Sequence, residues 1–348
     1  MNIHEKYIKR CIELAKNGLG ETYPNPMVGS VIVVDDVIIG EGWHKKAGGP
    51  HAEVNAINSV KDKLQLKNAT IYVNLEPCSH YGKTPPCSNL IVANGLKNVV
   101  IGIIDSNSKV SGRGVEYLKN NGCNVIVGVL ENKCAILNKR FFTFHNKKRP
   151  FIILKWAETT DGFIDRLRDN TSEKSPNWIS NKYSQQVVHK MRAVEQAILV
   201  GTTTVLNDNP NLTVRSWRGN NPVRIILDRT LKIPTSYNLL DGNVETIVLT
   251  ENSPNKSIIS NVRFEVADFS EDLPKQIYDV LFKNEIQSVI IEGGLQTLQT
   301  FIDTNLWDEA YIFVGNNSFK TGLKAPKMKK APIEIKNIST DTLKIYKN

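Results

Sequence analysis

The chain has 348 residues, of which 41% are hydrophobic and 23% charged, a composition that excludes a largely disordered protein. At about 100–200 residues per domain, this length favours two domains, each large enough to bury its own core. The net charge of +9 raises the question of a nucleic-acid partner, but residues 1–146 carry +5, residues 147–319 carry −2 and residues 320–348 carry +6. No long basic run precedes the basic tail, to which we assign no function.

The N-terminus and the cysteines predict a cytoplasmic protein. The first ten residues are charged and lack the apolar stretch of a signal peptide, and no run of about 18 apolar residues occurs anywhere. Five cysteines, an odd number spread along a long chain, fit a reducing compartment better than a disulfide framework. We expect most of them to be buried thiols.

Strand and helix patterns alternate in the first part of the chain. Two apolar runs on either side of Asp35 and Asp36 predict a hairpin. The expected strands are 29–34, 37–42, 69–75, 98–104 and 125–129, and the expected helices are 7–17, one that starts at 51, 87–94 and 114–120. This alternation predicts an α/β/α sandwich with a largely parallel sheet.

A polar, basic stretch that ends in proline, residues 145–150, predicts a boundary between two domains, 1–146 and 147–348. The second domain contains short, nearly continuous apolar runs of the kind found in strands buried on both faces. They are residues 151–156, 197–200, 223–227, 245–249 and 288–291. Because this half contains no Gly-x-Gly-x-x-Gly sequence, a Rossmann domain is not supported.

The strongest group of functional residues is His51 and Glu53, followed by Cys78 and Cys87. A catalytic zinc takes three protein ligands and leaves a fourth position for water, and one imidazole with two thiolates suits it. Glu53, near the first turn of a predicted helix, can reach that water without binding the metal, as a general acid or base must. Taken singly, these residues would also suit a helix cap, a solvated side chain and two core thiols. Their combination favours the zinc site.

This pattern resembles the cytidine-deaminase superfamily, whose nucleobase members carry H-x-E and P-C-x-x-C. Here eight residues instead of two separate Cys78 from Cys87. The long loop Pro-Cys-Ser-His-Tyr-Gly-Lys-Thr-Pro-Pro-Cys, with Pro-Asn-Pro at 24–26 and His44 upstream, resembles the deaminase half of the bifunctional riboflavin-biosynthesis deaminase/reductases. The resemblance implies one zinc per chain, held by His51, Cys78 and Cys87, with Glu53 as the catalytic residue.

The resemblance also implies a set of residues that bind the deaminase substrate: Asn25, His44, His80, Lys83, Asp105 and Asn107. His80 and Lys83 independently suit a phosphate, because both present donors or positive charge beside the predicted metal loop. For Asp105 and Asn107, composition alone favours a simple turn after a strand.

In the second half, Gly293 and Gly294 lie between an apolar run and a predicted helix. Free N–H groups at such a helix start can bind phosphate, although a turn that needs glycine for positive φ is the commoner reason for such residues. The segments 155–157, 161–162, 178–180, 200–210, 212–215 and 292–294 occur in the order of the family's reductase half, which is similar to dihydrofolate reductase and uses NADPH. The resemblance thins at residues 171–177 and 314–318.

The resemblance implies two sets of reductase residues. The cofactor-binding set is Ala157, Trp178, Thr204, Asp208, Arg229, Gly294, Leu295, Gln296, Thr297, Leu298, Gln299 and Thr300. The substrate-binding set is Lys155, Arg192, Leu212, Arg215 and Glu292. Arg192 and Arg215 can each present a planar fork to a phosphate, although a solvated surface would suit either of them.

The fold implied by the resemblance is a cytidine-deaminase-like α/β/α sandwich followed by a dihydrofolate-reductase-like α/β domain. The implied activities are zinc-dependent hydrolytic deamination of 2,5-diamino-6-(5-phosphoribosylamino)pyrimidin-4(3H)-one and NADPH-dependent reduction of the ribosyl chain of 5-amino-6-(5-phosphoribosylamino)uracil to ribityl. We expect a small phosphorylated pyrimidine substrate, a homo-oligomer (dimer or tetramer), and no nucleic-acid or membrane partner.

Two alternatives stay open. The net charge and the zinc motif suggest a nucleic-acid base deaminase with a C-terminal RNA-binding domain. The second half could instead be a non-catalytic regulatory module attached to the deaminase.

Overall fold

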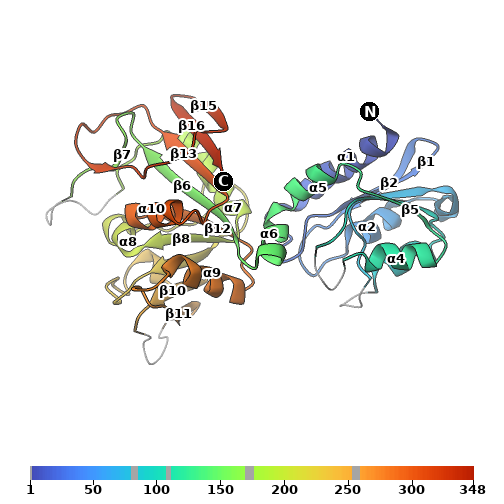
Figure 1. The fold of residues 1–348 in the computed structure, drawn as a ribbon, viewed down its shortest axis with the longest axis horizontal. Coiled ribbons are helices and arrows are strands. Elements are labelled where there is room, and N and C mark those ends of the chain that lie inside the picture. Colours follow the sequence, from blue (N-terminus) through green and yellow to red (C-terminus); the bar gives the residue numbers. More distant parts are fainter. Residues whose placement is uncertain (1, 80–84, 107–110, 169–175, 253–258) are drawn as a thin grey trace. The chain divides into compact units, whose positions relative to one another are not determined.

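A computed structural model describes residues 2–79, 85–106, 111–168, 176–252 and 259–348, and the chain divides into two compact units after Lys148 (Figure 1). The expected boundary at 146/147 falls inside helix α6 (Lys139–Lys147). That helix ends where Lys148 takes a left-handed conformation, with φ of 53°. The polar stretch 145–150, expected to be a linker, is therefore helical as far as Lys147.

The first unit contains a five-stranded sheet in the order β2-β1-β3-β4-β5. The predicted hairpin of β1 and β2 is confirmed, and β1 also runs antiparallel to β3. Only β3, β4 and β5 run parallel to one another, so the sheet is mixed and the prediction of a largely parallel sheet was wrong for its other half. The strands are β1 (Gly29–Val34), β2 (Val37–Trp43), β3 (Thr70–Leu75), β4 (Asn98–Ile103) and β5 (Asn124–Val127).

Helices cover both faces of this sheet. Ile8 of α1 and Cys134 of α5 pack with Val31 on one face, whereas Ile57 of α2 packs with Ile32 on the other. Neighbouring strand residues point to opposite faces, so the continuous apolar run of β1 supplies both cores. The helices of this unit besides α6 are α1 (Ile3–Ala15), η1 (Lys16–Gly18), α2 (Ala52–Ser59), η2 (Lys63–Asn68), α3 (Cys87–Ala93), α4 (Arg113–Asn120) and α5 (Glu131–Leu137).

The second unit is built on a nine-stranded sheet in the order β11-β10-β9-β8-β12-β6-β13-β16-β15. The strands from β11 to β13 all run parallel, and β16 and β15 are added antiparallel. The main strands are β6 (Phe151–Glu158), β8 (Ala197–Gly201), β9 (Val223–Leu227), β10 (Thr246–Thr250), β11 (Val262–Val266), β12 (Ser288–Gly293), β13 (Glu309–Val314), β15 (Glu334–Ile338) and β16 (Asp341–Lys347). The apolar runs that predicted strands all lie in this sheet.

The second sheet is also covered on both faces. Leu281 of α9 and Phe301 of α10 pack with Leu154 on one face, and Val205 of α8 packs with Ile153 on the other. The remaining elements are β7 (Phe163–Asp165) and β14 (Leu323–Lys324), which pair with each other, and the helices α7 (Lys182–Val194), α8 (Thr202–Asp208), η3 (Asn238–Leu240), α9 (Leu273–Lys283) and α10 (Leu295–Asp303).

The basic tail is part of the second unit's fold. It contributes β14, β15 and β16, and Asp341 accepts hydrogen bonds from the Asn181 N–H and the Ser184 hydroxyl at the start of α7, over 2.8 and 2.6 Å. Lys329 forms an ion pair of 3.0 Å with Asp303 of α10. The charge of +6 therefore lies on the surface of the last strands and beside α10.

All five cysteines are free thiols, and four of them are buried. Across the residues that the structure describes, we find no helix with both the length and the apolar character needed to span a bilayer.

Candidate functional site

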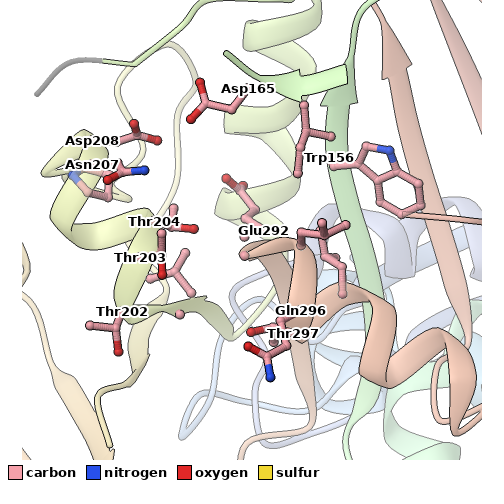
Figure 2. A pocket seen from close by; sticks show the side chains of 18 of the residues that line it. Trp156, Asp165, Thr202, Thr203, Thr204, Asn207, Asp208, Glu292, Gln296 and Thr297 are labelled. Atoms are coloured by element: carbon pink, nitrogen blue, oxygen red, sulfur yellow. The ribbon is translucent and has the colours of Figure 1, made fainter. Parts of the chain in front are cut away.

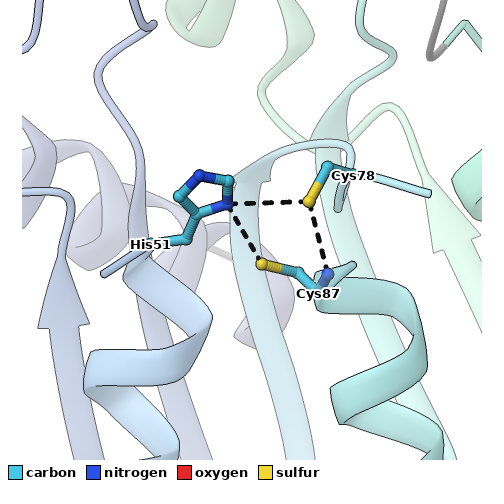
Figure 3. Close-up of side chains that lie close together, drawn as sticks. All are labelled: His51, Cys78 and Cys87. Atoms are coloured by element: carbon cyan, nitrogen blue, oxygen red, sulfur yellow. Dashed lines mark hydrogen bonds between the residues drawn. The ribbon is translucent and has the colours of Figure 1, made fainter. Parts of the chain in front are cut away.

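Three potential metal ligands meet where β3 ends in the first unit. His51 immediately precedes α2, Cys78 follows β3, and Cys87 is the first residue of α3. Nδ1 of His51 lies 3.2 Å from Sγ of Cys87 and 3.6 Å from Sγ of Cys78 (Figure 3). The Cys87 N–H donates to Sγ of Cys78 over 3.3 Å. The structure thus brings together the three ligands expected from the sequence, with their donor atoms all within 4.8 Å of one another.

This donor set fits zinc. Bonds of about 2.0–2.1 Å to nitrogen and about 2.3 Å to sulfur place the nitrogen and sulfur ligands of a tetrahedral ion about 3.5 Å apart, close to the two distances between His51 and the cysteines. Hydrogen bonds from Cys87 and His51 lower the pKa of the Cys78 thiol, which favours the thiolate that binds metal. Three protein ligands leave one position for water, as in catalytic zinc sites.

Glu53 lies beside this cluster in the first turn of α2 and is 3% exposed. Burial, together with the nearby Cys78, raises the pKa of its carboxyl group to about 7. A group with such a pKa can both accept and return a proton at neutral pH. The environment of Glu53 therefore suits a general acid and base.

Asn25 and His44 are joined by a hydrogen bond near the same site. Nδ1 of His44 lies 3.0 Å from the carbonyl oxygen of Pro50, and Nε2 lies 3.1 Å from Nδ2 of Asn25. A carbonyl only accepts, so the ring proton is on Nδ1 and Nε2 accepts from the Asn25 amide. Burial lowers the pKa of His44, which favours this neutral tautomer. The hydrogen bond holds the amide nitrogen of Asn25 and leaves Oδ1 as the end that can meet a ligand.

The other predicted residues of the deaminase site are placed less completely. Asp105 follows β4, is 7% exposed, and donates its backbone N–H to Oε2 of Glu76 over 3.2 Å. His80, Lys83 and Asn107 lie outside the described residues.

A cavity of about 1000 Å³ lies in the second unit, beside the carboxyl ends of β6, β8, β9 and β12. Ligands of parallel α/β sheets usually bind at this edge. Sixteen of the seventeen residues that the resemblance implied for the reductase line the cavity: Lys155, Ala157, Trp178, Arg192, Thr204, Asp208, Leu212, Arg215, Arg229, Glu292, Gly294, Leu295, Gln296, Thr297, Leu298 and Thr300. Gln299 is not among the lining residues, because its side chain hydrogen-bonds Asp303 and the Lys327 N–H instead.

A buried ionic group lies in the wall of this cavity around Glu292 (Figure 2). Arg192 donates to both carboxylate oxygens, over 3.0 and 2.7 Å, and Nζ of Lys155 lies 3.7 Å away. Burial alone would raise the pKa of Glu292, but Arg192 and Lys155 outweigh it and lower the pKa to about 2. Glu292 is therefore ionised at neutral pH and fixes both cations in place.

Arg215 faces the same cavity but forms no ion pair with any carboxylate in the described part of the chain. Its guanidinium donates to the Thr213 hydroxyl over 3.4 Å, and its backbone N–H donates to Nδ1 of His189 over 3.1 Å. Burial and the neighbouring Arg192 lower its pKa. An exposed cation that faces the cavity and has no carboxylate partner among the described residues is suited to receive an anionic ligand.

The glycines before α10 are required by the backbone and also face the cavity. Gly294 has φ of 86°, a conformation that side chains disfavour. A Cβ on Gly293 would lie 2.8 Å from the Thr204 hydroxyl. Both residues also line the cavity, where the first N–H groups of α10 can bind an anion.

Arg168 is a cavity residue that the sequence did not single out. It donates to Asp165 over 2.8 and 3.2 Å, to Asp208 over 3.0 Å and to the carbonyl oxygen of Asn207 over 3.2 Å. Figure 2 shows Asp165 and Asp208 on different elements of the cavity wall. Arg168 therefore ties the residues after β7 to the end of α8. Its partners in α8, Asn207 and Asp208, lie 39 and 40 positions away in the chain, so no local pattern could have identified the link.

Comparison with known proteins agrees with this two-part organisation. A family model described as "Cytidine and deoxycytidylate deaminase zinc-binding region" matches residues 1–103, and one described as "RibD C-terminal domain" matches residues 150–317. The "Riboflavin biosynthesis protein RibD" of Aquifex aeolicus is 41% identical over 324 residues, which cover 92% of this chain and 89% of that protein. The protein of the same name from Escherichia coli is 33% identical, with 89% and 87% covered.

Solved structures give the same result. A Thermotoga maritima diaminohydroxyphosphoribosylaminopyrimidine deaminase/5-amino-6-(5-phosphoribosylamino)uracil reductase superposes with a TM-score of 0.87 at 40% identity, covering 99% of this chain and 98% of that one. Acinetobacter baumannii RibD superposes with a TM-score of 0.87 at 32% identity over the same fractions. The expected fold, a cytidine-deaminase-like domain followed by a dihydrofolate-reductase-like domain, is confirmed. The second half is a reductase domain. The chain belongs to the RibD family of riboflavin biosynthesis proteins, with a zinc-binding deaminase domain followed by a reductase domain.

Proposed function

We propose that the first unit, residues 1–146 with the short extension to Lys148, hydrolytically deaminates 2,5-diamino-6-(5-phosphoribosylamino)pyrimidin-4(3H)-one. The second unit then reduces the ribosyl chain of 5-amino-6-(5-phosphoribosylamino)uracil to ribityl with NADPH. The observation that carries this proposal is the presence, in one chain, of the His51, Cys78 and Cys87 cluster beside buried Glu53 and of a large cationic cavity at the carboxyl ends of a parallel sheet.

In the deaminase, His51, Cys78 and Cys87 would hold one zinc ion. When bound, zinc lowers the pKa of a coordinated water and makes it a nucleophile at neutral pH. Glu53 would accept the proton of that water and return it to the amino group as it leaves as ammonia, a role that its burial beside the metal ligands favours. Asn25 binds the pyrimidine through Oδ1, and His44 positions Asn25 by accepting from its amide nitrogen.

The deaminase substrate also carries a ribose phosphate. We assign Asp105, Asn107, His80 and Lys83 to substrate binding. His80 and Lys83 suit the phosphate group, because their side chains offer hydrogen-bond donors or positive charge.

The reductase cavity has a volume of about 1000 Å³, which is at the upper end of the range usual for a pocket that binds one ligand. A cavity of this size suits a dinucleotide bound together with a sugar phosphate. The reduced cofactor supplies a hydride to the sugar. Arg215 receives the substrate phosphate, because it has no carboxylate partner among the described residues, and Arg192 and Lys155 stay oriented by Glu292 at the sugar.

The cofactor would occupy the part of the cavity that is lined by the start of α10. The N–H groups at the start of α10 bind its diphosphate. The remaining contacts come from Ala157, Trp178, Thr204, Asp208, Arg229 and the α10 residues that line the cavity.

The proposal includes the partners of the protein and the compartment in which it acts. Substrate binding does not extend to nucleic acid, since residues 147–319 carry no basic excess. Five free thiols suit a reducing compartment, so the protein acts in the cytoplasm. It acts there without a membrane partner. The family resemblance implies a homo-oligomer, a dimer or a tetramer.

The proposal is tested by following ammonia release and NADPH oxidation separately on the diaminopyrimidine substrate. Glu53→Gln should keep its zinc, lose at least about a hundredfold in the rate of ammonia release, and still oxidise NADPH when 5-amino-6-(5-phosphoribosylamino)uracil is added. Arg215→Gln should show the reverse pattern, with normal ammonia release and a raised KM for the uracil substrate. A Glu53→Gln enzyme that holds zinc and deaminates at the normal rate would contradict the assigned mechanism.

A further inference from the structure

Glu76 is a buried carboxylate that the mechanism above does not use. It directly follows β3, two residues before Cys78, and is 4% exposed. Its Oε2 accepts the backbone N–H groups of Asp105 over 3.2 Å and Gly112 over 3.0 Å. Its Oε1 accepts those of Gly114 over 2.8 Å and Val115 over 3.2 Å. One side chain thus satisfies four backbone donors from two separate segments.

Three of these donors belong to the start of α4. The first N–H groups of a helix have no partner inside the helix, and Gly112, the residue before α4, has no side chain that could accept from them. The Glu76 carboxylate takes this place from a distant strand, and its negative charge is favourable at a helix N-terminus. The segments are in close contact, because a Cβ on Gly114 would clash with the carbonyl oxygen of Pro77.

The fourth donor connects this arrangement to the deaminase site. Asp105 follows β4, and Cys78 follows β3, which runs parallel to β4. By accepting the Asp105 N–H, Glu76 fixes the residue after β4 relative to the turn that carries Cys78. A network in which every acceptor and donor is satisfied holds its members in a single arrangement.

We propose that Glu76 is a positioning residue of the deaminase, which holds Asp105 and the start of α4 against the Cys78 turn so that Asp105 can bind the substrate. This inference rests on the proposed role of Asp105. Among the described residues, Glu76 hydrogen-bonds the backbone N–H groups after β4 and at the start of α4, and none of these donors belongs to His51, Cys78 or Cys87. Its effect is therefore on substrate binding, with the zinc cluster and the proton transfer by Glu53 left intact.

The test is Glu76→Gln in the full-length, zinc-loaded chain. Glutamine keeps the size of the side chain but replaces one oxygen with an amide nitrogen, which would face two N–H donors with no acceptor. We expect the KM of the deaminase substrate to rise about tenfold, as for a loss of correct hydrogen bonding to a charged group. The kcat should change less than about twofold, with one zinc per chain and an unchanged rate of NADPH oxidation by the reductase.

Asp62→Asn is the matched control, because Asp62 accepts the Leu64 N–H at the start of η2 over 3.0 Å, in the same unit but on an exposed surface. It should leave the deaminase KM unchanged. Asp105→Asn completes a double-mutant cycle, in which Glu76→Gln should add little to the KM of an Asp105→Asn chain if it acts through Asp105.

A normal KM in Glu76→Gln, loss of zinc, or effects that add fully to those of Asp105→Asn would each overturn the positioning role. Failure of the unaltered chain to release ammonia from the diaminopyrimidine would contradict the proposed function instead, so the two failures are distinguishable.

Discussion

Arg168 donates a hydrogen bond of 3.0 Å to Asp208 across the wall of the reductase cavity. The two side chains are 14% and 28% exposed, and the same guanidinium holds Asp165 from the other side. Arg168 therefore joins two walls of the cavity whose residues are about 40 positions apart in the sequence.

Replacing Arg168 with Gln should loosen the cofactor site. Asp208 would lose its partner while Asp165 and Asp208 remain as carboxylates beside a polyanionic cofactor, so we expect the KM for NADPH to rise about five- to tenfold. Steady-state kinetics of NADPH oxidation measure this effect. Arg263→Gln, which removes the exposed ion pair with Glu245, should change that KM by less than about twofold. An unchanged KM in Arg168→Gln would show that the link does not support the cofactor.

Replacing Glu292 with Gln should destabilise the reductase unit. Arg192 and Lys155 would both lose their carboxylate partner inside the cavity wall, and breaking a buried ion pair costs about 3–5 kcal/mol in the free energy of unfolding. Urea denaturation followed by tryptophan fluorescence measures the change. Asp303→Asn removes an exposed pair with Lys329 and should cost less than about 1 kcal/mol. A Glu292→Gln chain as stable as its parent would mean that solvent screens this group.

His189 predicts how stability depends on pH. Burial, Arg192 and Arg215 lower its pKa from 6.5 to about 4. Between these values the unfolded chain binds a proton that the folded chain does not, so the contribution of His189 is complete above pH 6.5 and is lost as the pH falls toward 4. Asparagine can accept the Arg215 N–H without titrating. The loss of unfolding free energy between pH 6.5 and 4 should therefore be smaller in His189→Asn than in its parent, and equal slopes would refute the assignment.

Removing the metal should separate the two activities. A zinc chelator should abolish ammonia release, because without the metal no coordinated water is activated for attack on the pyrimidine, while NADPH oxidation with the uracil substrate continues at its normal rate. Added zinc should restore deamination in the chelated parent but not in Cys87→Ala. Parallel loss of both activities on chelation would argue against a metal confined to the first unit.

The sequence was most informative where function constrains several residues within a short stretch. The order of His51, Glu53, Cys78 and Cys87 was sufficient to predict a cluster that the structure assembles. Continuous apolar runs predicted the central strands, because those strands are buried on both faces.

Other features could not be predicted because their partners lie far apart in the chain. Glu76 and Arg168 act through backbone groups and carboxylates about 30 to 40 residues away. β15 escaped prediction because it is an exposed edge strand, whose sequence Glu-Ile-Lys-Asn-Ile does not carry a buried apolar face. Helix α6 was not predicted, and its last turn was interpreted as part of the domain boundary because it is polar and basic, as a linker also is.

The position of β6 in its sheet has a consequence for the order in which the chain is made. β6 is the first strand of the second unit, yet its two neighbours, β12 and β13, begin only at residues 288 and 309. On the ribosome, the deaminase unit can close as soon as its own strands have emerged, whereas β6 waits with both edges unpaired until nearly all of the chain has been synthesised. The central sheet of the second unit is thus completed last, and a chain that ends before residue 309 lacks one of the two neighbours of β6.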